Sequence, residues 1–575
     1  MLEDLERAFA AAAAARGWVS GHRLVRYLAG ITRYSRVQGT VGLLDAAKYV
    51  EDMLLQDAGE SLEVEIVKFG GTSVPDWMGA PTGWALLDAE VRVGSTVLKL
   101  SEHPTLVAAH SPPSGGVVSG EAVVIDRRWW RPESYANAKG KVVVSPGNPY
   151  VVYRLAVEAG AAAVALYSPS APPDAVPYKG LFLSRSEAQS WTIPAVSIPR
   201  SLAEAIEGKV VEIRVDADVR RDPGFPIVHA WIGDRSEPGP AAVAHLCHPT
   251  PGANDNASGS AAILEAAVAL SKMIDSGALP QPKRTIRFVW VPEYTGLSVV
   301  LNGHLKGLVT EVVNFDMVGV EEGGGNGPIR VVAGSLSAQG AADASLWLAS
   351  RAAARALGLR EPPVTPYESG SDHDVAAAYG IPAAMMNGWP DVYYHTDLDD
   401  VYRISRRALE FSSISALASL HLLAGGGVDA APFRSALLSE VIAERLAEGD
   451  GVGARLAASH LASRLGLQPL AERPAEWAPK IEGSVAQRPP MIGSIRVVAR
   501  RSPSAASEIL ELTEQFGSLG HTVYLAEALF LASPGRPLSE VATDLASVYG
   551  TRAVDERVLE RVVGALAESR LIELG

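Results

Sequence analysis

The sequence contains little cysteine, no long apolar run and no excess of positive charge. Its single cysteine, Cys247, excludes an intramolecular disulfide and is typical of a cytoplasmic protein. No apolar stretch reaches the roughly 20 residues of a membrane span, and the first residues lack the features of a secretory signal. A net charge of −14 argues against a protein that coats nucleic acid. We therefore expect a cytoplasmic protein with no membrane partner and no nucleic-acid partner, and composition leaves a homo-oligomer open.

The length of 575 residues predicts several domains, because a single hydrophobic core stops growing near about 250 to 300 residues. Residues 1–90 and 220–427 alternate strand-like and helix-like segments. This pattern predicts one discontinuous α/β domain, with a mostly parallel mixed sheet and helices on both faces. Residues 91–219 consist of short β-runs and many turns, which predicts a self-contained, β-rich insert. Residues 428–575 predict a helical C-terminal region.

The end of the C-terminal region has the order of a winged-helix module. Residues 523–574 predict helices followed by a short strand over residues 571–574. The helix that would read DNA, over residues 555–569, carries more acidic than basic residues. We therefore favour a packing or dimerisation role for this module over DNA binding.

Residues that can bind a metal recur where apolar, β-rich segments end. The carboxyl ends of strands in an α/β sheet meet in one crevice, so such residues can converge there. Zinc accepts histidine nitrogens and carboxylate oxygens, and a nearby glutamate can take a proton from water. A lone buried histidine is more often an ordinary core residue, but the repetition at four segments favours a metal site. The candidates are His245, His248 and Asp255 in residues 244–259, Glu293 in residues 288–296, Asp316 in residues 312–319 and His395 in residues 392–397.

The order of these motifs resembles the zinc aminopeptidases of the leucyl aminopeptidase and glutamate carboxypeptidase type, over roughly residues 20–425. The insert resembles the protease-associated domain of some members, and the C-terminal region resembles a branch of aminopeptidase-like proteins with a winged helix. The fold implied is that of a zinc exopeptidase. The matching motifs are Gly252–Gly259, Glu293–Gly296, Asp316–Gly319, Ser371–His373, Ile381–Ala383 and His395–Asp399.

The resemblance implies a role for each matched residue. Asp255 would bridge two metals, Asp316 would complete the first site, His395 would bind at the second, and Glu293 would be the general base. His245 and His248 are both candidates for the first histidine ligand, of which only one need bind. The cofactor implied is zinc, with one tightly bound ion, a second ion left open, and cobalt or manganese as alternatives. The residues expected around the metals or the substrate are Tyr294, Asp372, His373 and Asp399.

The sequence departs from the family pattern at Tyr294, which stands where the family has a second glutamate that binds metal. The second metal therefore lacks a carboxylate, which the extra histidine, Asp372 or water could replace. If the family's motif aligns with this sequence one residue further along, Glu293 takes the position of the ligand and no base remains.

The chemistry expected is metal-dependent hydrolysis of an amide bond, and the resemblance implies an aminopeptidase acting on peptides. The alternatives are a carboxypeptidase, a deacylase of small acylated metabolites, or a non-catalytic, receptor-like or regulatory binding protein with the same fold.

Overall fold

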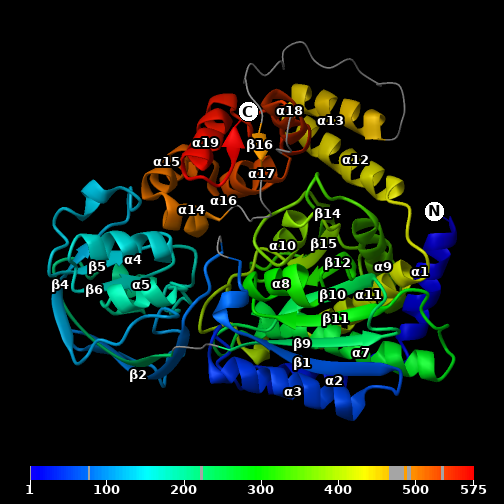
Figure 1. Ribbon diagram of the computed structural model, residues 1–575, viewed down its shortest axis with the longest axis horizontal. Helices are drawn as coiled ribbons and strands as arrows, with labels where there is room; N and C mark the ends of the chain where they lie inside the picture. The colour runs from blue at the N-terminus through cyan, green and yellow to red at the C-terminus, as the bar shows by residue number, and fades with distance from the viewer. Residues whose placement is uncertain are drawn as a thin grey trace.

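The computed structural model describes residues 2–75, 78–220, 224–464, 485–487, 494–531 and 536–574. It contains an eight-stranded sheet, a seven-stranded sheet and a set of C-terminal helices. In Figure 1 the insert with the seven-stranded sheet, in cyan, lies beside the domain of the larger sheet, mostly in green. The C-terminal helices, in orange and red, lie above both. Two mixed sheets together with many helices make this an α/β protein.

The larger sheet has a parallel centre and antiparallel margins, in the order β1-β9-β11-β10-β12-β15-β13-β14. Strands β11, β10, β12 and β15 are mutually parallel, whereas β9 and β13 run antiparallel to their neighbours in the centre. All residues of β10 and β11 are buried, as expected for strands covered on both faces. The strands are β1 (Leu62–Phe69), β9 (Phe225–Ile232), β10 (Gly239–His245), β11 (Ile286–Val291), β12 (Val309–Phe315), β13 (Ile329–Val332), β14 (Val364–Thr365) and β15 (Ala383–Gly388).

Long helices cover one face of this sheet and short ones the other. The long helices begin at clear caps: the Thr40 hydroxyl accepts from the Leu43 N–H, and the Ser405 hydroxyl accepts from the Arg407 N–H. Phe530 of the C-terminal region also packs on the second face. The first face carries α1 (Leu2–Ala15), α2 (Gly21–Ile31), α3 (Val41–Asp57), α7 (Gly259–Asp275), α9 (Ala341–Leu357) and α11 (Arg406–Ala424). The second carries α8 (Thr295–Val299), η4 (Val300–His304) and α10 (His373–Ala378).

Helix α7 and the turn before it, Ala253–Asp275, form the one helix among the described residues with the length and apolarity of a membrane span. Its most apolar stretch is 94% buried inside the molecule. Burial of this kind is also what the central helix of a water-soluble core shows, so the finding is weak evidence for a span.

The insert begins earlier than the sequence predicts. Its sheet has the order β3-β2-β8-β4-β5-β6-β7, and β2 pairs with β8 from Gly83 opposite Arg220 to Val93 opposite Val211. The domain therefore starts near Gly83, before the expected boundary at Val91. Its elements are β2 (Gly83–Val93), β3 (Thr96–Lys99), β4 (Val118–Val124), β5 (Val142–Ser145), α4 (Pro149–Glu158), β6 (Ala163–Leu166), α5 (Arg185–Ser190), β7 (Ala195–Ser197), α6 (Arg200–Ala203) and β8 (Val210–Arg220).

The C-terminal region packs on both other parts. Arg500 pairs with Glu187 of the insert at 3.2 Å, and Trp130 of the insert donates from Nε1 to Glu511 at 2.8 Å. The expected helices before residue 574 are present, although residues 532–535 of that stretch lie outside the described residues; the winged-helix assignment stays a prediction. The elements are α12 (Ala431–Ala447), α13 (Gly451–Arg464), α14 (Ile495–Arg501), α15 (Pro503–Thr513), α16 (Gly517–Gly520), η7 (His521–Glu527), α17 (Ala528–Leu531), α18 (Leu538–Tyr549), α19 (Glu556–Glu568) and the strand pair β16 (Val485–Gln487) and β17 (Glu573–Leu574).

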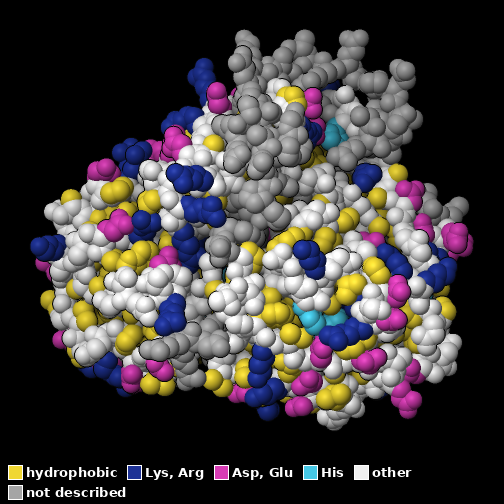
Figure 2. All heavy atoms as spheres, in the orientation of Figure 1, with side chains coloured by type: hydrophobic (Ala, Val, Ile, Leu, Met, Phe, Trp, Pro, Cys, Tyr) yellow, Lys and Arg dark blue, Asp and Glu magenta, His cyan; other side chains and the backbone are white. Residues whose placement is uncertain are grey.

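Charged side chains of both signs share the visible surface. Figure 2 shows Lys and Arg side chains interspersed with Asp and Glu side chains across this face. The described part of the face therefore presents no continuous basic band of the kind that follows a nucleic-acid backbone.

Candidate metal centre

The topology of the larger sheet brings the predicted residues to one edge. His245 is the last residue of β10, and β11 and β12 flank β10 in parallel. Glu293 follows the end of β11 and Asp316 follows the end of β12, so both arrive beside His245. Asp255 lies in η3 (Ala253–Ser258), the turn that joins β10 to α7. The centre therefore lies at the carboxyl ends of the parallel strands.

His395 reaches the same place from a turn and not from a strand, so the β-run expected over residues 392–397 is wrong. Strand β15 ends at Gly388, and Pro390 cannot donate a ladder hydrogen bond. The Tyr393 N–H then donates to Asp391 Oδ1 at 2.8 Å, which closes a turn. The His395 carbonyl accepts from the N–H of Tyr178 in the insert at 2.6 Å. The insert therefore helps to hold this histidine.

The histidines and carboxylates form two groups that share Asp255. In the first, His245 Nε2 lies 3.3 Å from both Asp255 Oδ1 and Asp316 Oδ1. In the second, Asp255 Oδ2 lies 3.5 Å from His248 Nε2 and 3.0 Å from His395 Nε2. The structure therefore brings both His245 and His248 to the centre, one in each group, whereas the sequence analysis required only one of them to bind.

The hydrogen bonds of two histidines leave a lone pair directed at Asp255. His245 Nδ1 lies 3.1 Å from the Cys247 carbonyl, and His248 Nδ1 lies 2.9 Å from the Pro249 carbonyl. A carbonyl only accepts, so each Nδ1 carries a proton and the Nε2 of the neutral ring is an acceptor. The Nε2 lone pairs of these histidines and the carboxylate oxygens of Asp255 therefore face one another, and a positive charge between them would stabilise the arrangement.

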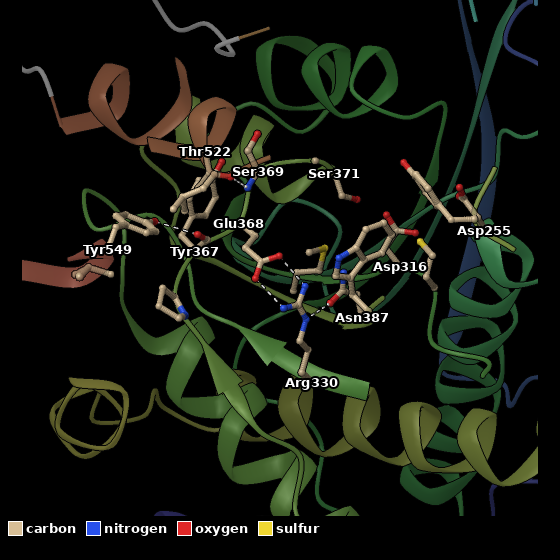
Figure 3. A pocket seen from close by; sticks show the side chains of 18 of the residues that line it. Asp255, Asp316, Arg330, Tyr367, Glu368, Ser369, Ser371, Asn387, Thr522 and Tyr549 are labelled. Carbon is tan, nitrogen blue, oxygen red and sulfur yellow. Dashed lines mark hydrogen bonds and ion pairs between the residues drawn. The ribbon is translucent and has the colours of Figure 1, made fainter. Parts of the chain in front are cut away.

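Two buried atoms of this centre have no hydrogen-bond partner in the described part of the chain. His248 Nε2 and Asp316 Oδ1 make no hydrogen bond with any described residue, although a buried polar group without a partner is costly. Imidazole nitrogens with carboxylate oxygens, oriented by carbonyls behind them, are a donor set that suits zinc. Figure 3 shows Asp255 and Asp316 at one end of the cleft.

When no metal ion is bound, the histidines and carboxylates of the centre shift one another's pKa. Burial lowers the pKa of His245, but Asp316 and Glu293 outweigh it and raise that pKa well above its usual range. Burial opposes the charged form of Asp255, yet His248 and the other histidines hold the pKa of this carboxyl well below its usual range. Protons and a metal ion would therefore compete for the centre.

Asp399 and Arg36 hold the turn that carries Asp255. Asp399 accepts from the Asn254 N–H at 2.7 Å and from the Asp255 N–H at 2.9 Å. Burial raises the pKa of Asp399 to about 7. The fully buried Arg36 donates to the carbonyls of Leu246 at 2.8 Å and Gly252 at 3.0 Å. Asp399 thus lies behind the metal-type residues, where the sequence expected it.

Glu293 lies beside the two groups without joining either. Its N–H donates to Cys247 Sγ at 3.1 Å, and its carbonyl accepts from Gln38 Nε2 at 3.0 Å. Its carboxylate lines the cleft with His245 and Asp316 and has no hydrogen bond within the described parts of the chain. Burial raises the pKa of this carboxyl well above its usual range, partly offset by His245. Burial likewise raises the pKa of the Cys247 thiol, as expected of a packing residue.

Tyr294 is turned towards acidic side chains and away from the position of a ligand. Its N–H donates to Asp372 Oδ1 at 2.8 Å, and its hydroxyl donates to Asp374 Oδ2 at 3.1 Å. Asp372 joins neither metal-type group, and burial raises its pKa to about 7. The third side chain of the second group is instead His248, next to Asp255 and His395.

His373 supports the loop beside these acidic residues. Its Nε2 lies 2.8 Å from the Glu368 carbonyl, and its ring packs 5.3 Å from the ring of Tyr367. It therefore lies near the cleft but outside both metal-type groups.

Sequence reasoning missed three residues from other parts of the chain. The ring of Tyr178 lies 4.6 Å from that of His248 and 5.0 Å from that of His395. The next residue, Lys179, is close enough for its charge to lower the pKa of His395, although burial lowers it more. The guanidinium of Arg496 lies 4.8 Å from the ring of Phe182, within electrostatic range of Glu293. None belongs to a motif, and only folding brings them to the centre.

The residues of the centre lie within a match to a peptidase family. The model of peptidase family M28 matches residues 227–418, which include His245, His248, Asp255, Glu293, Asp316 and His395. No curated protein matches the chain. The family match supports metal-dependent peptide hydrolysis for this part of the chain.

Solved structures share the fold at low identity. A zinc aminopeptidase from Bacillus subtilis is 20% identical, with 70% of this chain and 94% of that chain covered and a TM-score of 0.51. A peptidase M28 precursor from Shewanella amazonensis is 18% identical, covering 74% and 98%, with a TM-score of 0.53. A putative peptidase from Clostridium acetobutylicum is 14% identical and covers both chains completely, with a TM-score of 0.50. At these identities the likeness shows the fold alone.

Proposed function

We propose that this protein is a zinc-dependent aminopeptidase that removes N-terminal residues from peptides. The observation that carries the proposal is Asp255, whose Oδ1 faces His245 and whose Oδ2 faces His248 and His395. The carboxylate of Glu293 stands free beside them. The M28 match and the fold shared with a protein described as a zinc aminopeptidase support it.

The residues divide into two ligand sets and one base. His245, Asp255 and Asp316 would hold one ion, and His248, Asp255 and His395 the other. When bound, zinc supplies a Lewis acid that polarises the scissile carbonyl and makes water more acidic.

Glu293 takes the proton from water and returns it to the leaving amine. Because burial raises the pKa of Glu293, its carboxyl binds that proton more strongly than a solvent-exposed carboxyl would. Asp399 and Arg36 keep the turn around Asp255 in place during this exchange.

The same proposal includes the wider expectations from the sequence. The insert is of the protease-associated type, the C-terminal helices are a winged-helix-like packing module, and the protein acts on peptides in the cytoplasm. The separate sheet of the insert supports the first point. The small excess of acidic over basic residues in α19 supports a packing role for the C-terminal helices.

Hydrolysis of aminoacyl arylamides tests the proposal. We expect the zinc-loaded protein to cleave leucyl arylamide, to lose this activity with a chelator and to regain it with zinc. N-acetylated leucyl arylamide should not be cleaved. Cleavage of N-acyl peptides with a free C-terminal carboxylate, and not of the arylamides, would favour the carboxypeptidase or deacylase. A zinc-loaded protein that cleaves none of these substrates would favour a binding protein.

A further inference from the structure

The cleft extends from the metal centre to the C-terminal region. It has a volume of about 700 Å³, within the usual range for small-molecule sites. One end is lined by His245, Asp255 and Asp316. The other end is lined by Leu519, Thr522, Val548 and Tyr549, which all follow the part of the chain matched by the peptidase family.

The charged groups between these two ends are already paired. Glu368 accepts from Arg330 Nη1 and Nη2 at 2.7 Å each, and Asn387 accepts from Arg330 Nε at 3.0 Å, as Figure 3 shows. Arg445 donates to Glu448 at 2.6 Å and to Glu444 at 2.8 Å. Both guanidinium groups are engaged, so neither is free to attract an acidic substrate side chain, and the three carboxylates leave one negative charge in excess.

Leucine, valine and tyrosine side chains line part of the far end. The hydroxyl of Tyr549 donates to the Tyr367 carbonyl at 2.9 Å, and the hydroxyl of Tyr367 donates to Asp374. With both hydroxyls engaged, the small exposed part of the two rings is apolar and lies in the same lining as the half-buried Leu519 and the nearly fully buried Val548.

A buried carboxylate fixes this wall to the catalytic domain. Glu527 in η7 accepts from the Ser335 hydroxyl at 2.6 Å and from the Leu336 N–H at 3.0 Å. It is fully buried, and the Ser369 N–H donates to Thr522 at 3.3 Å nearby. A wall held by such contacts can select substrates by shape, because little of it moves when a ligand enters.

We propose that Leu519, Val548 and Tyr549 form a specificity wall that receives an apolar side chain of the peptide substrate. This inference rests on the proposed peptidase function and assigns the C-terminal helices to the substrate site. The wall would make the protein prefer leucine or phenylalanine over glycine or alanine next to the scissile bond.

Two opposite substitutions at the half-buried Leu519 test the wall. We expect wild-type kcat/KM to be higher for phenylalanyl and leucyl arylamides than for the alanyl arylamide. Leu519→Trp fills the cleft and should lower kcat/KM for the phenylalanyl substrate about tenfold, with little effect on the alanyl substrate. Leu519→Ala and Val548→Ala should reduce the difference in kcat/KM between the phenylalanyl or leucyl substrate and the alanyl substrate. Glu540→Phe, which adds an aromatic ring to the exposed side of α18, is the matched control and should change nothing.

Selectivity and turnover distinguish failure of the wall from failure of the proposed function. If Leu519→Trp lowers kcat/KM equally for all substrates and keeps the wild-type thermal transition, the proposed specificity wall is wrong. Absence of any turnover by zinc-loaded wild-type protein would overturn the proposed function instead. Calorimetry with free phenylalanine and glycine then tests the wall alone: tighter binding of phenylalanine that Leu519→Trp removes supports it, and equal binding contradicts it.

Discussion

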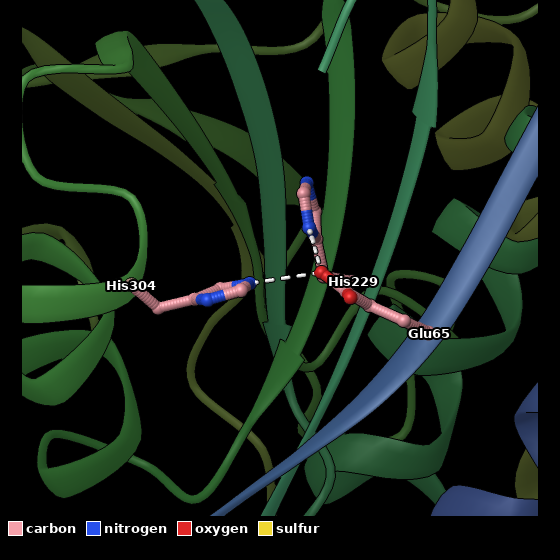
Figure 4. A group of neighbouring side chains, drawn as sticks. All are labelled: Glu65, His229 and His304. Carbon is pink, nitrogen blue, oxygen red and sulfur yellow. Dashed lines mark hydrogen bonds and ion pairs between the residues drawn. The ribbon is translucent and has the colours of Figure 1, made fainter. Parts of the chain in front are cut away.

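Two clusters in this protein contain the same kinds of side chain but differ in what surrounds them. One is the centre around Asp255. The other joins Glu65 of β1, His229 of β9 and His304 of η4, as Figure 4 shows. Glu65 Oε1 lies 3.3 Å from His229 Nδ1 and 3.0 Å from His304 Nε2, so its spacing alone also suits a metal.

Arginines make the second cluster a hydrogen-bond network and not a metal centre. Arg287 donates to His229 Nε2 at 3.4 Å, and Arg235 pairs with Glu65 Oε1 at 2.5 Å. Burial lowers the pKa of His229 to about 4, so its ring is neutral near pH 7. With Nε2 accepting, Nδ1 carries the proton and points it at Glu65, which leaves no free lone pair for a metal.

The difference teaches that ligand spacing does not define a metal centre by itself. Around Asp255, carbonyls accept from Nδ1 of His245 and His248 and direct their lone pairs inwards. Around Glu65, guanidinium groups supply the positive charge already. The second partner of each histidine therefore decides whether a cation is required.

The largest expected effect comes from removing the shared carboxylate. Asp255→Ala should lose both zinc ions and lower activity by on the order of 10³-fold or more, because each ligand set loses a member. Elemental analysis and arylamide hydrolysis measure the two effects. Glu65→Ala is the matched control and should retain wild-type zinc content. Full zinc content in Asp255→Ala would show that Asp255 is not a shared ligand.

Removing the base should separate chemistry from metal binding. Glu293→Gln should retain wild-type zinc content but lower kcat by about 10² to 10⁴-fold, because only proton transfer is lost. Loss of zinc from this variant would instead mean that Glu293 is a ligand and that the register of the motif is shifted by one residue.

Removing His248 should affect one ion only. We expect His248→Ala to bind one zinc ion per chain where the wild type binds two, because His245, Asp255 and Asp316 remain intact. His229→Ala should leave the zinc content unchanged. Two tightly held ions in His248→Ala would show that another side chain, such as Asp372, completes the second site.

The affinity for zinc should fall as the pH falls. Since the neighbouring carboxylates raise the pKa of His245 well above its usual range, protonated His245 persists at neutral pH and must lose a proton when zinc binds. The apparent Kd should therefore rise about tenfold per pH unit for each proton displaced. Competition with a zinc-binding dye between pH 6 and 8 measures this; a constant Kd would contradict the assignment of His245 as a ligand.

The smallest expected effect concerns the cluster that we do not assign to a metal. His304→Ala should lower the free energy of unfolding by no more than about 1 kcal/mol, because Glu65 is partly exposed and keeps its pair with Arg235. Denaturant unfolding with and without added zinc measures it. Stabilisation by zinc that this variant alone loses would identify a third metal site.

The sequence predicted the α/β fold and the residues of the centre because strand ends and motifs are local features. It placed Asp255 in the turn before a helix, and Glu293 and Asp316 at the carboxyl ends of strands. It could not choose between His245 and His248, since that choice depends on how residues 246–252 turn back towards Asp255. It also missed Tyr178 and Arg496, which lie near the centre, and Leu519, which lines the cleft, because only packing between domains brings them there.

Anomalous diffraction from crystals of the zinc-loaded protein tests the central claim most directly. The account predicts two zinc peaks, one on each side of the Asp255 carboxylate, with His245 and Asp316 at the first and His248 and His395 at the second. It also predicts no peak among Glu65, His229 and His304. A single peak, a peak coordinated by Glu293, or a peak at the Glu65 cluster would contradict it.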